Sequence, residues 1–208
     1  MIPGPAQCLR LMDDYRMLPN IRAHSLVVAR IAEFLAVGLC RTGAGIDIAL
    51  TLAAALLHDI AKSLCLTSGC NHALVGRDIC LEHDLIELAP LVAQHVILND
   101  DDSFPQTAIS AKEIVYYADK RVNHDQIVPL EDRLVYILDR YGEDDPLRHA
   151  LIRANFERCR AIEHAIFEGL GFTPQQLSER LDDFCPSWQE IVPADPGQPM
   201  ANQTGLCP

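Results

Sequence analysis

The sequence predicts an all-α protein, a compact helical bundle folded around one core. First, its 208 residues suffice for one domain with a sizeable interior and at most an appendage. Second, 49% of the residues are hydrophobic but only 6% are aromatic, and Ala and Leu dominate over Val, Ile and Thr, a mix that favours helix over sheet. Third, apolar residues recur at three- and four-residue spacing, as expected of helices with a buried face.

The net charge limits the kinds of molecule that the protein is expected to bind, and the cysteine content indicates its cellular compartment. The formal net charge is −12, so a nucleic-acid polymer is not expected as a partner, whereas a small anionic substrate is compatible if the few basic residues cluster. The eight cysteines are irregularly spaced, no leader segment precedes them, and no apolar stretch approaches the ~20 residues of a membrane span. We therefore expect a cytoplasmic protein with reduced thiols and no membrane contact, and the sequence leaves a homodimer open.

The chain divides into four parts. Residues 1–20 form an N-terminal lead-in with at most a short helical piece. Residues 21–142 hold the main domain, and residues 143–185 add C-terminal helices that pack on it. Residues 186–208, rich in Pro and Gly with little to bury, form an extended tail.

The first long helix is expected at residues 21–40. Its inward stripe carries His24 together with Val28, Ile31 and Leu35. A lone inward histidine is more often a core residue bonded to a backbone carbonyl than a metal ligand. His24 is a candidate ligand because other candidate ligands accompany it.

The next helix, at residues 46–64, is apolar on nearly every face and is therefore expected to be buried on all sides. His58 and Asp59 enter this dry environment, where a carboxylate is costly unless it is paired or binds a cation. An imidazole beside a carboxylate is a natural start for a metal site, and Lys62 lies one turn further on the same side. Lys62 could instead be only a structural partner of Asp59.

The dipeptide His-Asp is a weak signal when taken alone. It occurs twice more, as His83-Asp84 and as His124-Asp125, each time in polar surroundings near a predicted helix end. The apolar context distinguishes the pair at His58.

Three further candidate ligands follow. Asn71 can cap a helix at residues 71–81 that places His72 in its first turn, although surface histidines are common there too. His95 lies on the apolar stripe of a helix at residues 85–97. Asp119 ends the apolar part of a helix at 108–123, where an exposed Asp paired with Lys120 or Arg121 is the alternative.

The last helices have clear boundaries. They are expected at residues 129–141 and 146–170, each with Pro in its first turn and Gly at its end, and a short one starts at Thr173.

Taken together, the candidates form a pattern that none forms alone. Imidazoles and carboxylates from several helices, nearly all on inward faces, describe a metal centre inside a helical bundle, and such ligands suit Fe, Mn, Zn or Mg. The candidate ligands are His24, His58, Asp59, His72, His95 and Asp119. An alternative structural zinc site would use Cys65, Cys70, His72 and Cys80, whose spacing matches no common zinc pattern.

The order His, His-Asp, Asp, with His58-Asp59 inside Leu-Leu-His-Asp-Ile-Ala-Lys, resembles the HD-domain superfamily of metal-dependent phosphohydrolases over residues 22–139. His72 and His95 resemble the extra histidines of subgroups with a two-metal centre. The stretch from Ile114 to Lys120 is similar to the HDIG-type branch that includes symmetrical diadenosine tetraphosphate hydrolases. This chain departs from that branch in the segment after Lys120, so the substrate does not carry over.

The resemblance implies a role for each candidate. His24, His58, Asp59 and Asp119 would hold one divalent ion, and Asp59 would bridge to a second ion held by His72 and His95, with Fe or Mn favoured over Zn or Mg. Two cations ~4 Å apart can activate a bridging water and neutralise phosphoryl oxygens. Asp59 and Lys62 would be the catalytic residues, and Lys62, Lys120 and Arg121 would bind the phosphates of the substrate.

The expected function is hydrolysis of a nucleotide, or of another small phosphate ester or anhydride, by a metal-activated water. The alternative is a catalytically silent module of the same superfamily that binds metal and nucleotide as a sensor or regulator. The intact ligand set and Lys62 favour the enzyme, because a sensor need not keep every catalytic position.

Overall fold

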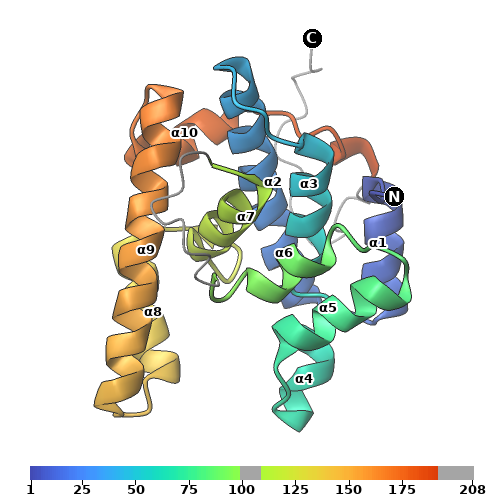
Figure 1. Ribbon diagram of the computed structural model, residues 1–208, viewed down its shortest axis with the longest axis vertical. Coiled ribbons are helices and arrows are strands. Elements are labelled where there is room, and N and C mark those ends of the chain that lie inside the picture. The colour runs from blue at the N-terminus through green and yellow to red at the C-terminus, as the bar shows by residue number, and fades with distance from the viewer. Residues whose placement is uncertain (99–108, 192–208) are drawn as a thin grey trace, which may run out of the picture.

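The computed structural model describes residues 1–98 and 109–191, and it confirms the prediction of an all-α bundle (Figure 1). A small antiparallel hairpin, β1 (Val122–Asn123) and β2 (Gln126–Ile127), interrupts the helices, and 3-10 turns lie at Pro174–Gln176 and Gln189–Ile191. The helices are α1 (Pro5–Asp14), α2 (Pro19–Arg41), α3 (Ile48–Leu57), α4 (Lys62–Ser68), α5 (His72–Glu82), α6 (Ala89–Gln94), α7 (Ala111–Lys120), α8 (Leu130–Tyr141), α9 (Pro146–Leu170) and α10 (Leu177–Asp182).

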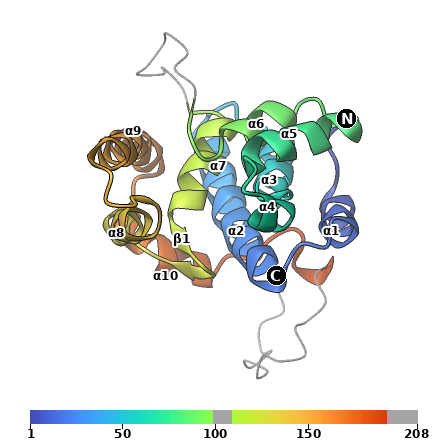
Figure 2. The same ribbon diagram turned by 90° about the horizontal axis from the view of Figure 1, so that it is seen from below.

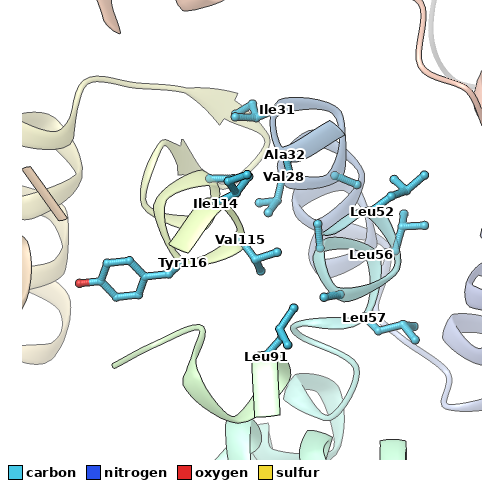
Figure 3. Close-up of a cluster of buried hydrophobic side chains, with 14 of the residues drawn as sticks. Val28, Ile31, Ala32, Leu52, Leu56, Leu57, Leu91, Ile114, Val115 and Tyr116 are labelled. Atoms are coloured by element: carbon cyan, nitrogen blue, oxygen red, sulfur yellow. The ribbon is translucent and has the colours of Figure 1, made fainter. Parts of the chain in front are cut away.

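Helices α2, α3 and α7 form the centre of the core, with α7 packed on both of the others (Figure 3). Val28 of α2, Leu56 of α3 and Ile114 of α7 are fully buried there. Every residue of α3 from Thr51 to Leu57 is buried, which confirms the prediction of a helix enclosed on all sides. The pair α8 and α9 lies beyond α7, on the side away from α1 (Figure 2).

The helix expected at residues 46–64 is divided in two. α3 ends at Leu57, and α4 begins at Lys62. In between, the amides of Ile60 and Lys62 donate to the carbonyls of Leu57 and Asp59, so the chain turns more tightly than an α-helix. His58 and Asp59 therefore lie on a turn between two helices, still within the core.

Other helix boundaries follow local chemistry. Asn71 caps α5, as predicted, by accepting hydrogen bonds from the amides of Ala73 and Leu74. The helix expected at 85–97 shortens to α6, and the one expected at 108–123 ends with α7 at Lys120. Sequence reasoning missed the hairpin that follows, because its strands have only two residues each. The helices expected at 129–141 and 146–170 are confirmed as α8 and α9.

The two ends of the chain contribute more to the core than expected. Helix α1 buries Cys8, Leu9, Leu11 and Met12, so residues 1–20 are more than a lead-in. The prediction of an extended tail is wrong for residues 186–191. There the amide of Ser187 donates to the carboxylate of Glu33, and Trp188 is only 6% exposed. Residues 192–208 of that predicted tail lie outside the described part of the chain.

Two helical stretches, Pro19–Arg41 and Ile48–Ser68, are long and apolar enough to cross a membrane by length and composition alone. This corrects the expectation that no apolar stretch approaches membrane-spanning length. More than half of each apolar window is buried inside the protein, as in the core helices of soluble proteins, so the finding is weak support for a membrane span.

Cys65 of α4 and Cys70, just before α5, form a disulfide. The expectation of reduced thiols is therefore wrong for this pair. The expected cytoplasmic location stays a prediction.

Candidate metal centre

The structure brings all six predicted ligands to one place in the core. His24 comes from α2, His58 and Asp59 from the turn after α3, and His72 begins α5. His95 follows α6 directly, and Asp119 lies in the last turn of α7. His24, His58, Asp59 and His95 are at most 5% exposed, and the side chain of Asp119 is 13% exposed. Residues almost one hundred positions apart in the sequence thus share a buried site.

Their ligand atoms fall into two overlapping groups. His24, His58 and Asp119 each offer an atom within 4.8 Å of the others, and so do His58, Asp59 and His95. Each group has the size of the first coordination sphere of a metal ion. The residues that could hold a metal ion are therefore present, in the N/O combination expected for a divalent cation.

The two carboxylate oxygens of Asp59 face different partners. Asp59 Oδ2 lies 3.4 Å from His58 Nε2 and 3.9 Å from His24 Nε2. Asp59 Oδ1 lies 3.3 Å from His72 Nε2 and 3.5 Å from His95 Nε2. A carboxylate placed in this way can serve two neighbouring metal positions, one through each oxygen.

Backbone carbonyls orient three of the imidazole rings. The Nδ1 atoms of His24, His58 and His95 lie 2.7–2.8 Å from the carbonyl oxygens of His124, Ala55 and Val92, respectively. Because a carbonyl only accepts, each Nδ1 carries the proton and donates it. When a ring is neutral, its Nε2 lone pair then points into the centre, which is the arrangement that metal-binding histidines require.

Polar atoms at the centre lack a hydrogen-bond partner, and a bound cation could take the place of one. His58 Nε2 and Asp59 Oδ1 are buried and make no hydrogen bond within the described residues. His24 Nε2 lies 3.0 Å from Asp119 Oδ1, a contact that would require a second proton on the ring. A divalent ion between these atoms would replace that proton and satisfy the lone pairs. The donor set therefore fits a divalent metal.

Charges around the centre keep both carboxylates anionic. Burial alone would raise the pKa of Asp59, but His58 and Lys62 lower it well below its usual range. Burial likewise opposes ionisation of Asp119, yet the bond to His24 and the charge of Lys120 hold its pKa well below normal. Burial lowers the pKa of His95, which favours the neutral ring that a metal needs.

Lys62 lies beside the centre as predicted from its spacing. Its Nζ donates to Asp59 Oδ2 over 2.7 Å, and its side chain is 31% exposed. Burial would lower its pKa, but Asp59 and Asp119 raise it, so the ammonium stays charged. Lys62 also lines the adjacent cavity, and it can therefore reach a bound anion.

Lys120 and Arg121 do not fit the predicted role of phosphate binding. Lys120 Nζ donates to the carbonyl of His95 and lies 3.8 Å from the centre of the Tyr116 ring. Arg121 is 4% exposed, and its guanidinium bonds Tyr117, Glu163 and backbone carbonyls. Neither side chain is among the described residues that line the cavity, and Lys120 Nζ lies 3.6 Å from Asp119 Oδ2.

A cavity of about 440 Å³ adjoins the centre. His72, His95, Asp119 and Lys62 line one end, and α8 and α9 supply much of the rest, including Arg133, Tyr141 and Phe156. Sequence reasoning missed this wall. Arg133 carried a usable signal, because it is a cation between Leu130 and Leu134 on the apolar face of a predicted helix.

The alternative zinc site does not form. Cys65 and Cys70 are joined as a disulfide and have no thiolate to offer. Cys80 is 1% exposed, and burial raises the pKa of its thiol to about 12. The site that the structure supports contains no cysteine.

Comparison with known proteins identifies the family. A family model described as the HD domain matches residues 21–144, more than half of the chain. No curated protein and no solved structure gives a significant match. The match includes every residue of the candidate centre, from His24 to Asp119. The chain therefore belongs to the HD-domain family, whose members are mostly metal-dependent hydrolases.

Proposed function

We propose that the protein is a phosphohydrolase that uses two divalent metal ions to cleave a small phosphate ester or anhydride, such as a nucleotide. One observation carries the proposal above the others. Asp59 directs one oxygen toward His24 and His58 and the other toward His72 and His95. A bridging carboxylate between two sets of ligands is the arrangement that a two-metal hydrolytic centre needs.

The residues of the chain would divide the work as follows. His24, His58, Asp59 and Asp119 would hold one ion, and Asp59, His72 and His95 the other, with Fe or Mn favoured. When bound, such ions supply Lewis-acid charge and a water whose pKa is lowered. Lys62 would donate to a phosphoryl oxygen or to the leaving group from the rim of the cavity. The buried apolar side chains around His58 and Asp59, which are at most 1% exposed, keep these two residues away from bulk water, and this strengthens their interactions.

The test combines metal analysis with turnover. Protein purified without added metal should contain close to two Fe or Mn ions per chain, and it should release phosphate or a nucleotide product from a broad panel of phosphate esters and anhydrides. Removal of the metal with a chelator should abolish release, and Mn²⁺ should restore it. Tight nucleotide binding without product over long incubation would contradict the hydrolase and favour the silent sensor instead.

Replacing Lys62 separates its chemical role from a structural one. Lys62→Ala should keep the metal ions but lower kcat by about tenfold to a hundredfold, because a charged donor to the phosphoryl group is lost. Lys62→Arg should recover part of the loss. Metal analysis and steady-state kinetics of both variants provide the measurement. If Lys62→Ala instead loses metal, Lys62 acts mainly by holding Asp59.

A further inference from the structure

The cavity beside the candidate centre has two unlike ends. At one end His72, His95, Asp119 and Lys62 gather charge and ligand atoms. The rest of the lining comes from the segment after α6 and from helices α8 and α9, and most of it is aliphatic or aromatic: Val96, Ile97, Ile137, Leu151, Ile152 and Phe156. Its polar members are Arg133, Tyr141 and Asn155. A molecule that fills the cavity would therefore meet charge and ligand atoms beside the centre and a largely apolar wall along α8 and α9.

Part of this apolar wall is exposed to solvent. Ile97 is 63% exposed and Leu151 62% exposed, and Leu66, on the α4 side of the cavity, is 61% exposed. Large apolar side chains that gather around one cavity, rather than being scattered singly over the surface, are typical of a ligand site. These side chains would gain burial from an apolar ligand group.

Two polar groups in the wall, Asn155 and Arg133, already make hydrogen bonds, although Arg133 Nε is buried without a partner within the described residues. Asn155 Nδ2 donates to the carbonyl of Val96, while Asn155 Oδ1 accepts from the hydroxyl of Tyr116. Arg133 Nη1 donates to Asn123 Oδ1, and its guanidinium lies 5.3 Å from the centre of the Tyr136 ring. A nucleobase needs donors and acceptors along its edge, and Asn155 already has both its amide nitrogen and its amide oxygen in hydrogen bonds.

Positive charge is also limited. Among the described residues that line the cavity, Lys62 and Arg133 are the two with cationic side chains. Together with metal ions, they match a single phosphoryl group better than an extended polyphosphate, whose further charges would lie against the apolar wall.

From this arrangement we infer that the substrate is a phosphate monoester of an apolar alcohol, alkyl or aryl, with its phosphoryl group at the metal centre and its carbon chain along α8 and α9. The inference rests on the proposed function. In the reaction, the oxygen of water forms a bond to phosphorus, and the bond from phosphorus to the ester oxygen breaks. One proton of that water ends on the departing alcohol, so the products are the alcohol and inorganic phosphate.

The test compares monoesters that share a phosphoryl group and differ in the rest. The metal-loaded protein is assayed with ethyl phosphate, octyl phosphate below its micelle concentration, 1-naphthyl phosphate and adenosine 5′-monophosphate. We expect kcat/KM for octyl and naphthyl phosphate to exceed the values for ethyl phosphate and the nucleotide by about tenfold or more, since each buried methylene adds to binding. A nucleotide value equal to or above that of octyl phosphate overturns the inference and leaves the hydrolase proposal intact.

A binding measurement covers the case in which no ester is hydrolysed. Octylphosphonate and ethylphosphonate carry a stable carbon–phosphorus bond and are titrated calorimetrically into the metal-loaded protein. Binding of octylphosphonate at least about tenfold tighter supports the apolar wall even if the proposed hydrolysis fails. Equal affinities for the two phosphonates contradict it.

Two leucines of α9 provide matched variants. Leu151 lines the cavity and is 62% exposed, whereas Leu147, one turn earlier, is 68% exposed and does not line it. Leu151→Asn should lower the ratio of kcat/KM for octyl phosphate to that for ethyl phosphate by about fivefold or more, and Leu147→Asn should leave the ratio at its original value. Both positions are at the surface, so neither change threatens folding. The same ratio in both variants would overturn the placement of the chain along α9.

Discussion

Asp59→Asn is expected to empty both proposed metal positions and to lower kcat by at least about a thousandfold. The amide has nearly the same shape as the carboxylate but carries no charge and offers one acceptor oxygen in place of two. Asp59 Oδ2 faces His24, His58 and Lys62, and Oδ1 faces His72 and His95, so the substitution removes an interaction on both sides at once. Elemental analysis of the purified variant and phosphate release measure the two losses.

The control for this variant is Asp125→Asn. Asp125 also follows a histidine, but it is exposed in the hairpin turn, where its carboxylate accepts from Gln126. Its replacement should leave metal content and turnover within about twofold of the original protein, as for most surface substitutions. An Asp59→Asn protein that keeps two ions and full turnover would refute the bridging role.

The second large effect concerns stability. Arg121→Met should lower the free energy of unfolding by about 3 kcal/mol or more, because it removes one partner from a buried charged network. The guanidinium bonds the Tyr117 hydroxyl, a Glu163 oxygen at 3.3 Å and the carbonyls of Val128 and Pro174. Without it, the Glu163 carboxylate loses its cationic partner and keeps the Tyr117 hydroxyl as a donor, and the carbonyls of Val128 and Pro174 lose the donor that Arg121 supplies. Denaturant unfolding followed by circular dichroism gives the difference.

The matched change is Arg153→Met on the exposed side of α9. It should alter stability by no more than about 0.5 kcal/mol. If the Arg121→Met protein kept its stability and had a higher KM for the substrate, that result would support the role of Arg121 in phosphate binding that the sequence predicted.

The sequence carried enough information to predict that the candidate ligands lie in the core. Each of His24, His58 and His95 lies on an apolar helical pattern, and a buried polar group in such a pattern calls for a partner. Spacing also placed Lys62 on the same side as Asp59. The meeting of His24 with Asp119 depends on the packing of α2 on α7, which the periodicity of either helix cannot show by itself.

Other parts of the structure depended on information that local patterns lack. Lys120 and Arg121 look like free cations in the sequence, but their direction is set by where α7 stops and the hairpin begins. The disulfide between Cys65 and Cys70 depends on the turn of the chain after α4. The cavity wall from α8 and α9 arises from contacts between segments far apart in the chain.

The carbonyl acceptors behind the imidazoles have a consequence for tolerance to mutation. His24, His58 and His95 are oriented by main-chain oxygens of His124, Ala55 and Val92, and no amino-acid replacement deletes a main-chain oxygen. The ring tautomers therefore do not depend on which side chains stand at those three supporting positions, provided that the backbone keeps its course. The orientation of the imidazole rings thus depends on the path of the backbone. Insertions or prolines that redirect the backbone are the changes expected to disturb it.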